Sequence, residues 1–301
     1  MALLKERKTP AENIAFMGIS AGIVVAFGLL STFLPLSSFL VILFLPLVCA
    51  LTAFYCQDRY LIGYVAATIV VSLLATVYDI SVTLFDVVPA ILTGTLFGFL
   101  LKKKISSSLT ILIVSLLKLG LNYLMLFLLK GVYGIDIIQS FLTLLRLDNK
   151  EHIREIVPAF IFGYALIQES ISFFVIIFGS NSLEAMETKK VSPFVFAILS
   201  LAGIACSIGF SFLSYAVAYL FGALSIYLSF ASSSSLFRKN PWWVYLGLGL
   251  LLALSFYLSA YFYASLPKQG APLLFLSFFA SISLCSGFSS LLFKNEKGVK
   301  E

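Results

Sequence analysis

Long apolar runs separated by short polar segments are the dominant pattern of this chain. Residues 13–57 and residues 191–237 contain no Asp, Glu, Lys or Arg. A helix needs ~20 residues to cross the apolar core of a bilayer, and each run is about twice that length. Each run therefore predicts two consecutive spans joined by a tight turn, which Pro35 marks in the first run and Ser211 marks in the second.

Ten spans account for the whole pattern, which predicts an all-α polytopic transmembrane helical bundle. The segment at 87–101 is short and has Pro89 near its start, so we expect it to be thin, tilted or partly re-entrant. The ten expected spans are 14–34, 37–56, 60–78, 87–101, 108–129, 156–179, 193–213, 215–235, 242–265 and 272–293.

The distribution of basic residues orients this bundle. With the N-terminus in the cytoplasm, 14 of the 20 Lys and Arg residues fall in cytoplasmic segments, 5 fall in outer segments, and Lys118 lies within a span. Lys and Arg favour cytoplasmic loops, so we expect both termini in the cytoplasm. Helical spans indicate the cell (inner or cytoplasmic) membrane, because outer-membrane proteins are β-barrels.

Composition and charge agree with this placement and suggest a division of the chain. Hydrophobic residues make up 60% of the chain and charged residues only 11%, whereas soluble domains carry about 25% charged residues. The net charge of +6 resides between the spans, so it favours lipid headgroups as partner and not nucleic acid. The polar segment 180–192 divides the chain into a six-span region, 1–190, and a four-span region, 191–301. We interpret Ser232–Ser235 as a flexible helix end.

Motifs for catalysis or for cofactor binding are absent from the sequence. The only histidine, His152, lies in a charged outer loop, and neither HExxH nor a P-loop motif occurs. The cysteines are widely spaced and form no CxxC pair, which predicts neither a metal site nor a redox pair. We therefore expect a protein that is not an enzyme and has no cofactor or metal. The cysteines are Cys49, Cys56, Cys206 and Cys285.

Small residues form a stripe along the first span. Successive members are three or four residues apart, so they share one helical face. In lipid, small residues let another helix approach closely. The stripe is either the docking face for a partner protein or a close contact within the chain. Its members are Ala11, Ala15, Gly18, Gly22 and Ala26.

Two opposite charges are predicted near the middle of consecutive antiparallel spans. Lys118 lies in the fifth span and Glu169 in the sixth, with Asn122 one turn from Lys118 and Gln168 beside Glu169. An isolated charge at the bilayer centre costs at least ~2.5 kcal/mol, which predicts that the two form an ion pair. These four residues either line the pathway of a substrate or coupling ion, or they join two helices.

Two carboxylates flank the expected outer loop between the third and fourth spans. Asp79 begins this loop and Asp86 ends it. They are candidates for the rim of an outer entrance that a ligand or cation approaches. Ordinary solvated loop carboxylates are the alternative interpretation.

The layout of the chain resembles a known family. A small-residue first span (ENIAFMGISAGIVVAFG), a KKK loop near residue 102, Pro158 at the start of the sixth span and KKVSPF at the start of the seventh follow in order. This order resembles the YybS-like family of uncharacterised bacterial polytopic membrane proteins. The ending SGFSSLLFK departs from the Gly-and-Asp ending of that family.

The first six spans are also similar to the substrate-binding component of energy-coupling-factor vitamin transporters. That component has six helices, both termini inside, and a small-residue first helix that docks on a coupling membrane protein. The resemblance implies that Ala11, Ala15, Gly18 and Gly22 belong to a docking face. It also implies ABC-type ATPases as further partners. The last four spans have no counterpart in such a component.

Two functions of different classes follow from these features. The first is a membrane transporter, or its substrate-binding component, for a small molecule such as a vitamin-like micronutrient, with energy from a partner ATPase or an ion gradient. The second is a non-transporting scaffold or assembly protein of the cell envelope that binds partners through its first span. A lipid-modifying enzyme ranks last, because acidic and histidine side chains are scattered.

Overall fold

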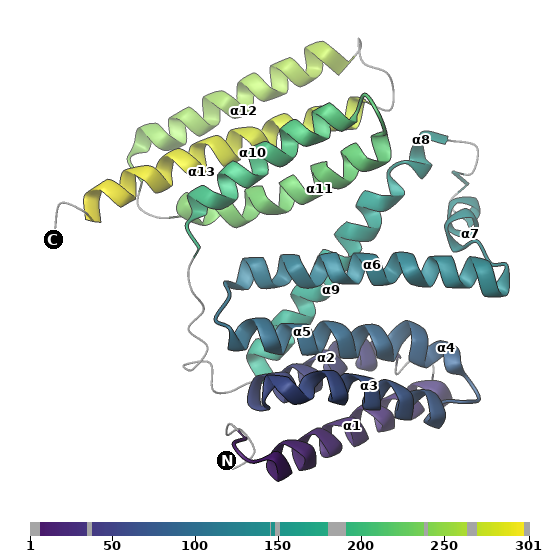
Figure 1. Cartoon of the computed structure of the whole chain (residues 1–301). Coiled ribbons are helices and arrows are strands. Elements are labelled where there is room, and N and C mark those ends of the chain that lie inside the picture. Colours follow the sequence, from purple (N-terminus) through teal and green to yellow (C-terminus); the bar gives the residue numbers. More distant parts are fainter. Residues whose placement is uncertain are drawn as a thin grey trace. The chain divides into compact units, whose positions relative to one another are not determined.

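In the computed structural model of the chain, most described residues are helical and none lies in a strand (Figure 1). Nine of its helical stretches are long and apolar enough to cross a membrane, and Val41–Tyr55 is a shorter apolar helix. The prediction of an all-α, multi-pass membrane protein is confirmed at this level. The predicted turn at Pro35 and most of the segment 180–192 lie outside the described residues, which are 7–34, 38–144, 146–147, 151–179, 191–237, 240–263 and 270–297.

The chain divides into two compact units. The first contains Met1–Asp136 and Tyr164–Lys189, and the second contains Ile137–Gly163 and Lys190–Glu301. The segment Ile137–Gly163 belongs to the second unit, with the C-terminal helices. The helix α9 (Val157–Gly179) therefore begins in the second unit and ends in the first.

The first unit is built from consecutive helices at its N-terminal side and from the last part of α9. Its most buried candidate span runs through Ile80–Lys102 without interruption. The predicted short span at 87–101 is therefore wrong in its start, because helical structure already begins at Ile80. The helices are α1 (Pro10–Phe33), α2 (Ser38–Tyr55), α3 (Asp58–Ala75), α4 (Ile80–Val82), the π-helical turn η3 (Thr83–Val87), α5 (Val88–Lys102) and α6 (Ser107–Tyr133).

Local sequence signals determine where these helices begin and end. Thr9 and Glu12 form a capping box at the start of α1, with Pro10 in its first turn, which satisfies backbone N–H groups that have no partner in the helix. Ser106 caps α6 in the same way by accepting a hydrogen bond from the N–H of Leu109. Gly134 ends α6 with φ of 68°, a left-handed conformation that glycine adopts without strain.

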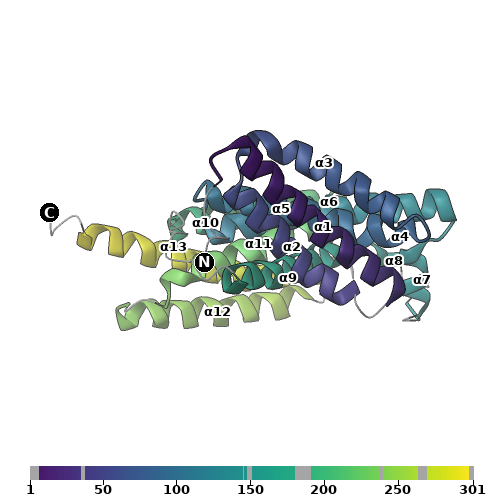
Figure 2. The same cartoon turned by 90° about the horizontal axis from the view of Figure 1, so that it is seen from below.

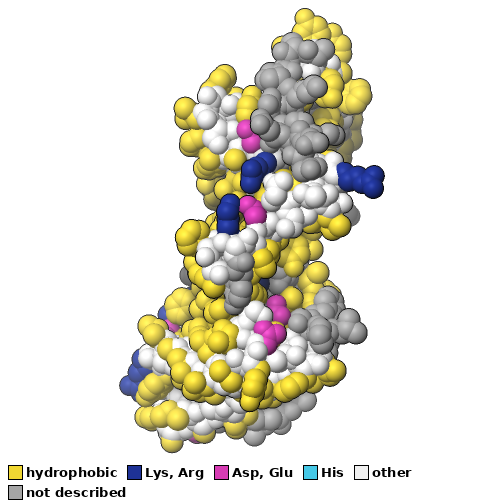
Figure 3. Space-filling model, turned by 90° about the vertical axis from the view of Figure 1, so that its right-hand side faces the viewer, with side chains coloured by type: hydrophobic (Ala, Val, Ile, Leu, Met, Phe, Trp, Pro, Cys, Tyr) yellow, Lys and Arg dark blue, Asp and Glu magenta, His cyan; other side chains and the backbone are white. Residues whose placement is uncertain are grey.

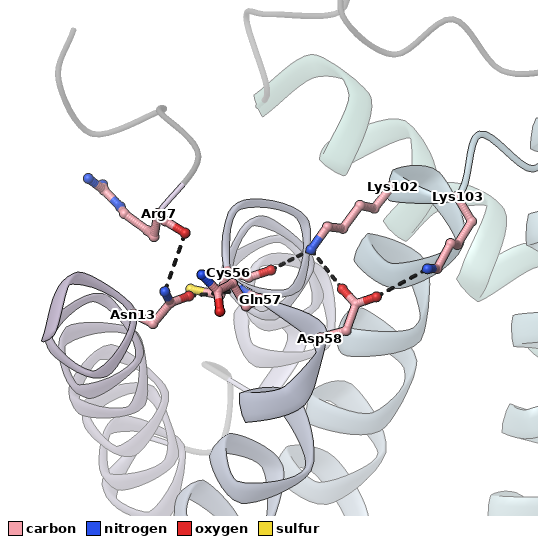
Figure 4. Close-up of polar contacts among 7 residues, drawn as sticks. All are labelled: Arg7, Asn13, Cys56, Gln57, Asp58, Lys102 and Lys103. Carbon is pink, nitrogen blue, oxygen red and sulfur yellow. Dashed lines mark hydrogen bonds and ion pairs between the residues drawn. The ribbon is translucent and has the colours of Figure 1, made fainter. Parts of the chain in front are cut away.

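A polar cluster ties together the end of the first unit where α1 begins (Figure 4). The Asn13 amide donates to the carbonyl oxygens of Arg7 and Thr9 and accepts from the backbone N–H of Gln57. Lys102 forms an ion pair of 2.7 Å with Asp58. Helices α1, α3 and α5, distant in sequence, are therefore joined at one end by polar contacts.

The second unit consists of the C-terminal helices together with α7, α8 and the first residues of α9. In the second unit, α12 packs along α13 and leaves most of its own surface uncovered (Figures 1 and 2). The elements are α7 (Ile137–Leu144), α8 (Glu151–Arg154), the start of α9, α10 (Pro193–Phe210), α11 (Tyr215–Ser232), η5 (Ser233–Ser235), α12 (Trp242–Tyr263), η6 (Ala271–Phe275) and α13 (Leu276–Lys297).

Buried serine hydroxyls hold the helices of the second unit together. Ser207 on α10 donates to the carbonyl oxygen of Ala218 on α11, and Ser283 on α13 donates to Ser200 on α10. Ser235 is fully buried and hydrogen bonds to Ser286 of α13. The interpretation of Ser232–Ser235 as a flexible end is therefore wrong, since this run packs against α13.

Figure 3 shows one face of the molecule in which hydrophobic side chains predominate and charged side chains form a few isolated patches. Many large apolar side chains are exposed along the spans, for example Ile62 at 82% and Phe127 at 74%. In water such a surface would drive aggregation. It fits a chain whose helices face lipid.

Candidate functional site

The buried charged residues Lys118 and Glu169 lie beside an apolar cluster formed by side chains of α5, α6 and α9. Phe97, Val114 and Phe173 come from these three helices and belong to the same buried cluster. The rings of Phe97 and Phe173 have their centres 5.8 Å apart. These contacts place the three residues at a common level along the helices.

One helical turn from this cluster, each of the three helices carries a buried polar side chain. Thr93 on α5, Lys118 on α6 and Glu169 on α9 each lie four residues from their own helix's member of the cluster, and residues four apart share a helix face. Helix α6 runs opposite to α5 and, obliquely, to α9 (Figure 1). The three polar side chains therefore lie on the same side of the apolar cluster.

Lys118 and Glu169 are both withdrawn from the surface of the unit. Lys118 is 6% exposed and Glu169 is 1% exposed. The carboxylates of Glu169 and Asp86 both act electrostatically on the Lys118 ammonium. Among the described residues, however, no N···O contact within ion-pair distance joins Lys118 to Glu169. The two charges are neighbours without direct contact.

Several hydrogen-bonding groups beside these charges are without a partner among the described residues. The Oε2 atom of Glu169 is buried and unpartnered. Two buried hydroxyls also have no hydrogen-bond partner among the described residues. They belong to Ser115, one turn before Lys118, and to Ser172, one turn after Glu169. Each such group costs about 1–3 kcal/mol. A bound molecule that supplied the missing partners would recover this free energy. Further unpartnered hydroxyls on α5 and α6 are those of Thr93, Thr95 and Thr110.

Asp86 lies in the π-helical turn η3 and not in a loop. The turn Thr83–Val87 connects α4 directly to α5, and the Thr83 hydroxyl is hydrogen bonded to the Thr76 hydroxyl and to the carbonyl oxygen of Ser72. Single π-turns within α-helices are rare overall, but those that occur are often found at functional sites. Here the turn holds a carboxylate within electrostatic range of Lys118.

The other residues predicted for the pathway are arranged differently. Asn122 is half-buried, one turn beyond Lys118 on α6, and shares its face. Gln168 is half-buried beside Glu169 in sequence and so points to another side of α9. Asp79 accepts a hydrogen bond from the Ser81 hydroxyl at the start of α4. The pair predicted as an outer entrance is therefore divided between a loop end, Asp79, and the π-turn, Asp86.

The small-residue stripe of α1 faces away from the described part of the protein. All five members are exposed. A β-carbon built on Gly18 or on Gly22 would meet nothing within 4 Å. The stripe therefore makes no close helix contact with the described residues. Its members are Ala11, Ala15, Gly18, Gly22 and Ala26.

An apolar hollow of about 220 Å³ lies between α12 and α13 in the second unit. Phe256 and Tyr263 of α12 face Leu274 and Phe278 across it. Its lining offers Ser259 as the main polar group, and that hydroxyl already donates to the Leu274 carbonyl oxygen. The hollow has no charged lining residue, so it lacks the means to orient a polar substrate.

Sequence reasoning found the charged members of the site but missed the hydroxyl groups and the π-turn. Ser115 precedes Lys118 by three residues and Ser172 follows Glu169 by three, a spacing that places each on the face of its charged neighbour. That spacing was a signal available in the sequence. Nothing in the sequence distinguishes a π-turn at Thr83–Val87 from a loop.

The sequence matches no family model, and comparisons with curated proteins and with solved structures found no match.

Proposed function

We propose that this chain is a membrane transporter, or the substrate-binding component of one, that binds a small molecule among α5, α6 and α9 of the first unit. The observation that carries the proposal is the buried Glu169 carboxylate with an unpartnered oxygen, held near the buried Lys118 ammonium on a facing helix. Ionisable side chains inside a membrane are costly and are retained mainly where they bind ions or substrates.

The apolar cluster beside this site gives the binding step a direction. Phe97, Val114 and Phe173 fill the space between the helices on the side toward Lys102, while the polar side chains begin one turn away. A molecule that reaches Lys118 and Glu169 from the other side is stopped at the cluster. With the N-terminus in the cytoplasm, that approach is from outside the cell. Passage inward then requires Phe97 and Phe173 to separate.

Energy for such a separation comes from a partner ATPase or from an ion gradient. The similarity of the first six spans to energy-coupling-factor substrate-binding components favours a coupling membrane protein that docks on α1, with ABC-type ATPases beneath it. The exposed stripe around Gly18 and Gly22 supports this interpretation, since its surface is free of close contacts with the described residues. A vitamin-like micronutrient is the substrate class that this similarity implies.

The same exposed stripe supports a second candidate, a scaffold of the cell envelope that binds partners through α1 without transport. The scaffold would use Gly18 and Gly22 but would have no need of Glu169. Transport therefore requires Glu169, whereas a scaffold requires only the exposed face of α1 around Gly18 and Gly22.

Analysis of bound molecules in purified protein tests the proposal. The full chain is purified in mild detergent, its co-purifying proteins are identified, and small molecules released on denaturation are measured by mass spectrometry. We expect a compound retained by the wild type and by Lys130→Ala, a control that breaks the exposed Lys130–Asp136 ion pair. The doubly substituted Lys118→Ala, Glu169→Ala protein should lose it.

Two results would argue against transport. A folded wild type that retains no compound, and whose associated proteins include no ATPase, favours the scaffold. A compound retained equally by the doubly substituted protein places the binding site elsewhere.

A further inference from the structure

Basic side chains gather at the end of the first unit where α1 and α3 begin and α2 and α5 end. Figure 4 shows part of this end, with two lysine ammonium groups directed at the carboxylate of Asp58. The other described carboxylate at this end belongs to Glu12, which caps the start of α1. Positive charge therefore exceeds negative charge here. The basic residues are Arg7, Lys8, Arg59, Lys102, Lys103 and Lys104.

Lys104 ends α5 in a backbone conformation that costs free energy. Its φ is 58°, in the left-handed region that glycine enters without strain and other residues enter rarely. The N–H of Ile105 donates to the carbonyl oxygen of Leu100, and the N–H of Lys104 donates to that of Leu101. This pair of hydrogen bonds usually ends a helix with glycine in the place of Lys104. Strained residues cluster at functional sites, so a use for the lysine side chain would account for its presence.

Two further exposed cations lie beside Lys104. The Lys103 ammonium is 3.2 Å from Oδ2 of Asp58, and Arg59 directly follows Asp58 in the sequence. The other oxygen of this carboxylate is 2.7 Å from the Lys102 ammonium, so two lysines already share one negative charge. Among the described residues, no carboxylate lies within ion-pair distance of Arg59 or Lys104. This exposed group therefore offers positive charge to an anion from outside the chain.

The surroundings of these cations favour a lipid headgroup as that anion. The Arg59 guanidinium lies 4.6 Å from the centre of the Tyr60 ring, and the Lys103 ammonium lies 5.3 Å from the centre of the Phe99 ring. Ile62, three residues after Arg59 and on its face of α3, is 82% exposed. Because α3 is long and apolar enough to cross a membrane, this face meets acyl chains and Arg59 stands at the level of the headgroups.

We propose that Arg59, Lys103 and Lys104 bind the phosphate of an acidic phospholipid headgroup at this end of the first unit. Guanidinium and ammonium groups form strong, charge-assisted hydrogen bonds with phosphate oxygens. A zwitterionic headgroup carries its own cation beside the phosphate and leaves the positive excess in place, whereas an acidic headgroup neutralises it. The site uses neither Lys118 nor Glu169, so it does not depend on the proposed transport function.

Native mass spectrometry of the full chain, purified in an uncharged detergent, tests the proposal. Affinities are compared for phosphatidylglycerol and phosphatidylcholine with identical acyl chains. Glycerol 3-phosphate provides the same phosphate without a membrane anchor, and polyglutamate provides the acidic surface of a protein. The midpoint of thermal unfolding, Tm, is measured in the same detergent without lipid to check that each variant is folded.

The backbone conformation of Lys104 allows a variant that separates binding from stability. Lys104→Gly removes the cation and also the strain, so we expect it to raise Tm while it weakens phosphatidylglycerol binding. Arg146 has the same φ of 58° and is exposed, but it belongs to the second unit. Arg146→Gly is therefore the matched control, which should raise Tm and leave lipid affinity unchanged.

We expect the wild type to bind phosphatidylglycerol more tightly than phosphatidylcholine. Each of Lys104→Gly, Arg59→Gln and Lys103→Gln should lower the affinity for phosphatidylglycerol by about fivefold, because a basic residue near an anionic membrane surface contributes about 1 kcal/mol. High salt should reduce the preference as well, since it screens exposed charges.

Four results would overturn the proposal. Equal affinities for the two lipids would show that the cations do not select an acidic headgroup. An equal loss in Arg146→Gly would mean that any basic residue attracts the lipid. Unchanged affinity in Lys104→Gly, Arg59→Gln and Lys103→Gln would place lipid binding elsewhere. If polyglutamate or glycerol 3-phosphate binds through these residues and phosphatidylglycerol does not, the partner is an acidic protein or a soluble phosphate.

Discussion

Gly98 of α5 lies directly against the backbone of Ala50 of α2. A β-carbon built on Gly98 would stand 2.8 Å from the Ala50 carbonyl carbon and 2.8 Å from the Ala53 β-carbon. One turn earlier, a β-carbon on Gly94 would stand 2.6 Å from the Pro46 carbonyl oxygen. The two glycines form a G-x-x-x-G motif, and close backbone approach is how such motifs join helices in lipid.

We expect Gly98→Ala to destabilise the protein by about 1–3 kcal/mol, the usual cost of forcing extra volume into a packed interior. The obstructing atoms belong to backbone and to a short side chain, so they cannot move aside as a flexible side chain would. The measurement is unfolding of the purified protein in SDS.

The control for this substitution is Gly120→Ala on α6, where a β-carbon would meet nothing within 4 Å. It should leave stability unchanged or raise it by up to ~1 kcal/mol, because alanine favours helix over glycine. Equal stabilities for Gly98→Ala and Gly120→Ala would show that α2 and α5 are not in close contact in the membrane.

The apolar pattern was enough to predict the helices but not their contacts. Hydropathy reports which segments prefer lipid, and it recovered apolar helices on both sides of Pro35 and Ser211. It cannot report which small residues face another helix. The stripe through Gly18 and Gly22, prominent in the sequence, is exposed, whereas Gly94 and Gly98 lie at a packed contact.

Polar residues within apolar segments were also misinterpreted from the sequence as breaks in the helices. Asp86 suggested a loop, but it lies in a π-turn of the continuous helical stretch Ile80–Lys102, where Lys118 interacts with its charge. Ser232 and Ser235 suggested a flexible end, but they are buried. A serine hydroxyl can hydrogen bond to the backbone of its own or of a neighbouring helix, so serine alone does not signal a break in a membrane helix.

Energetic coupling between Lys118 and Glu169 is the second prediction. Lys118→Ala should destabilise the protein more than Lys118→Ala combined with Glu169→Ala, because the single change leaves a buried carboxylate with less compensation. A double-mutant cycle of unfolding free energies measures this, with an expected coupling of about 0.5–3 kcal/mol. Additive effects would mean that the two charges do not interact, and the same cycle on exposed Lys130 and Asp136 should give a value near zero.

The third prediction concerns the Asn13 side chain, which is fully buried and forms three hydrogen bonds with Arg7, Thr9 and Gln57. Asn13→Ala removes the acceptor of the Gln57 backbone N–H and a donor to the Arg7 carbonyl oxygen, so we expect a loss of about 1–3 kcal/mol. Gln57→Ala should cost less, because the Gln57 backbone N–H still donates to Asn13. Faster hydrogen exchange of the backbone N–H of residue 57 in Asn13→Ala, but not in Gln57→Ala, checks the cause, because this N–H donates to the Asn13 side chain. Unchanged exchange would contradict it.

The reactivity of Cys56 is the fourth prediction. Cys56 lies between α2 and α3, is 1% exposed, and burial raises the pKa of its thiol to about 11, although Arg7 and Lys102 oppose this rise. The thiolate is the reactive form, so in a variant with Cys56 as the only cysteine, alkylation should quicken about tenfold per pH unit from pH 8 to pH 10. The same chain unfolded in SDS should reach its plateau at lower pH. A plateau near pH 9 in the folded protein would mean that the thiol is exposed.

The exposed stripe of α1 supplies the fifth prediction, which separates transport from scaffolding. Gly18→Leu and Gly22→Leu should leave the stability of the isolated protein almost unchanged, because nothing lies within 4 Å of either added β-carbon. If α1 docks on a coupling protein, the two substitutions should reduce co-purification of the ATPase. They should also reduce cellular uptake of the compound that the purified protein retains. Loss of a co-purifying partner with unchanged uptake would favour the scaffold.

Gly63→Ala on α3, which also has open space at its β-carbon, is the matched control. If Gly18→Leu lowers stability as Gly98→Ala does, the stripe packs against the protein itself, and both docking interpretations fail together.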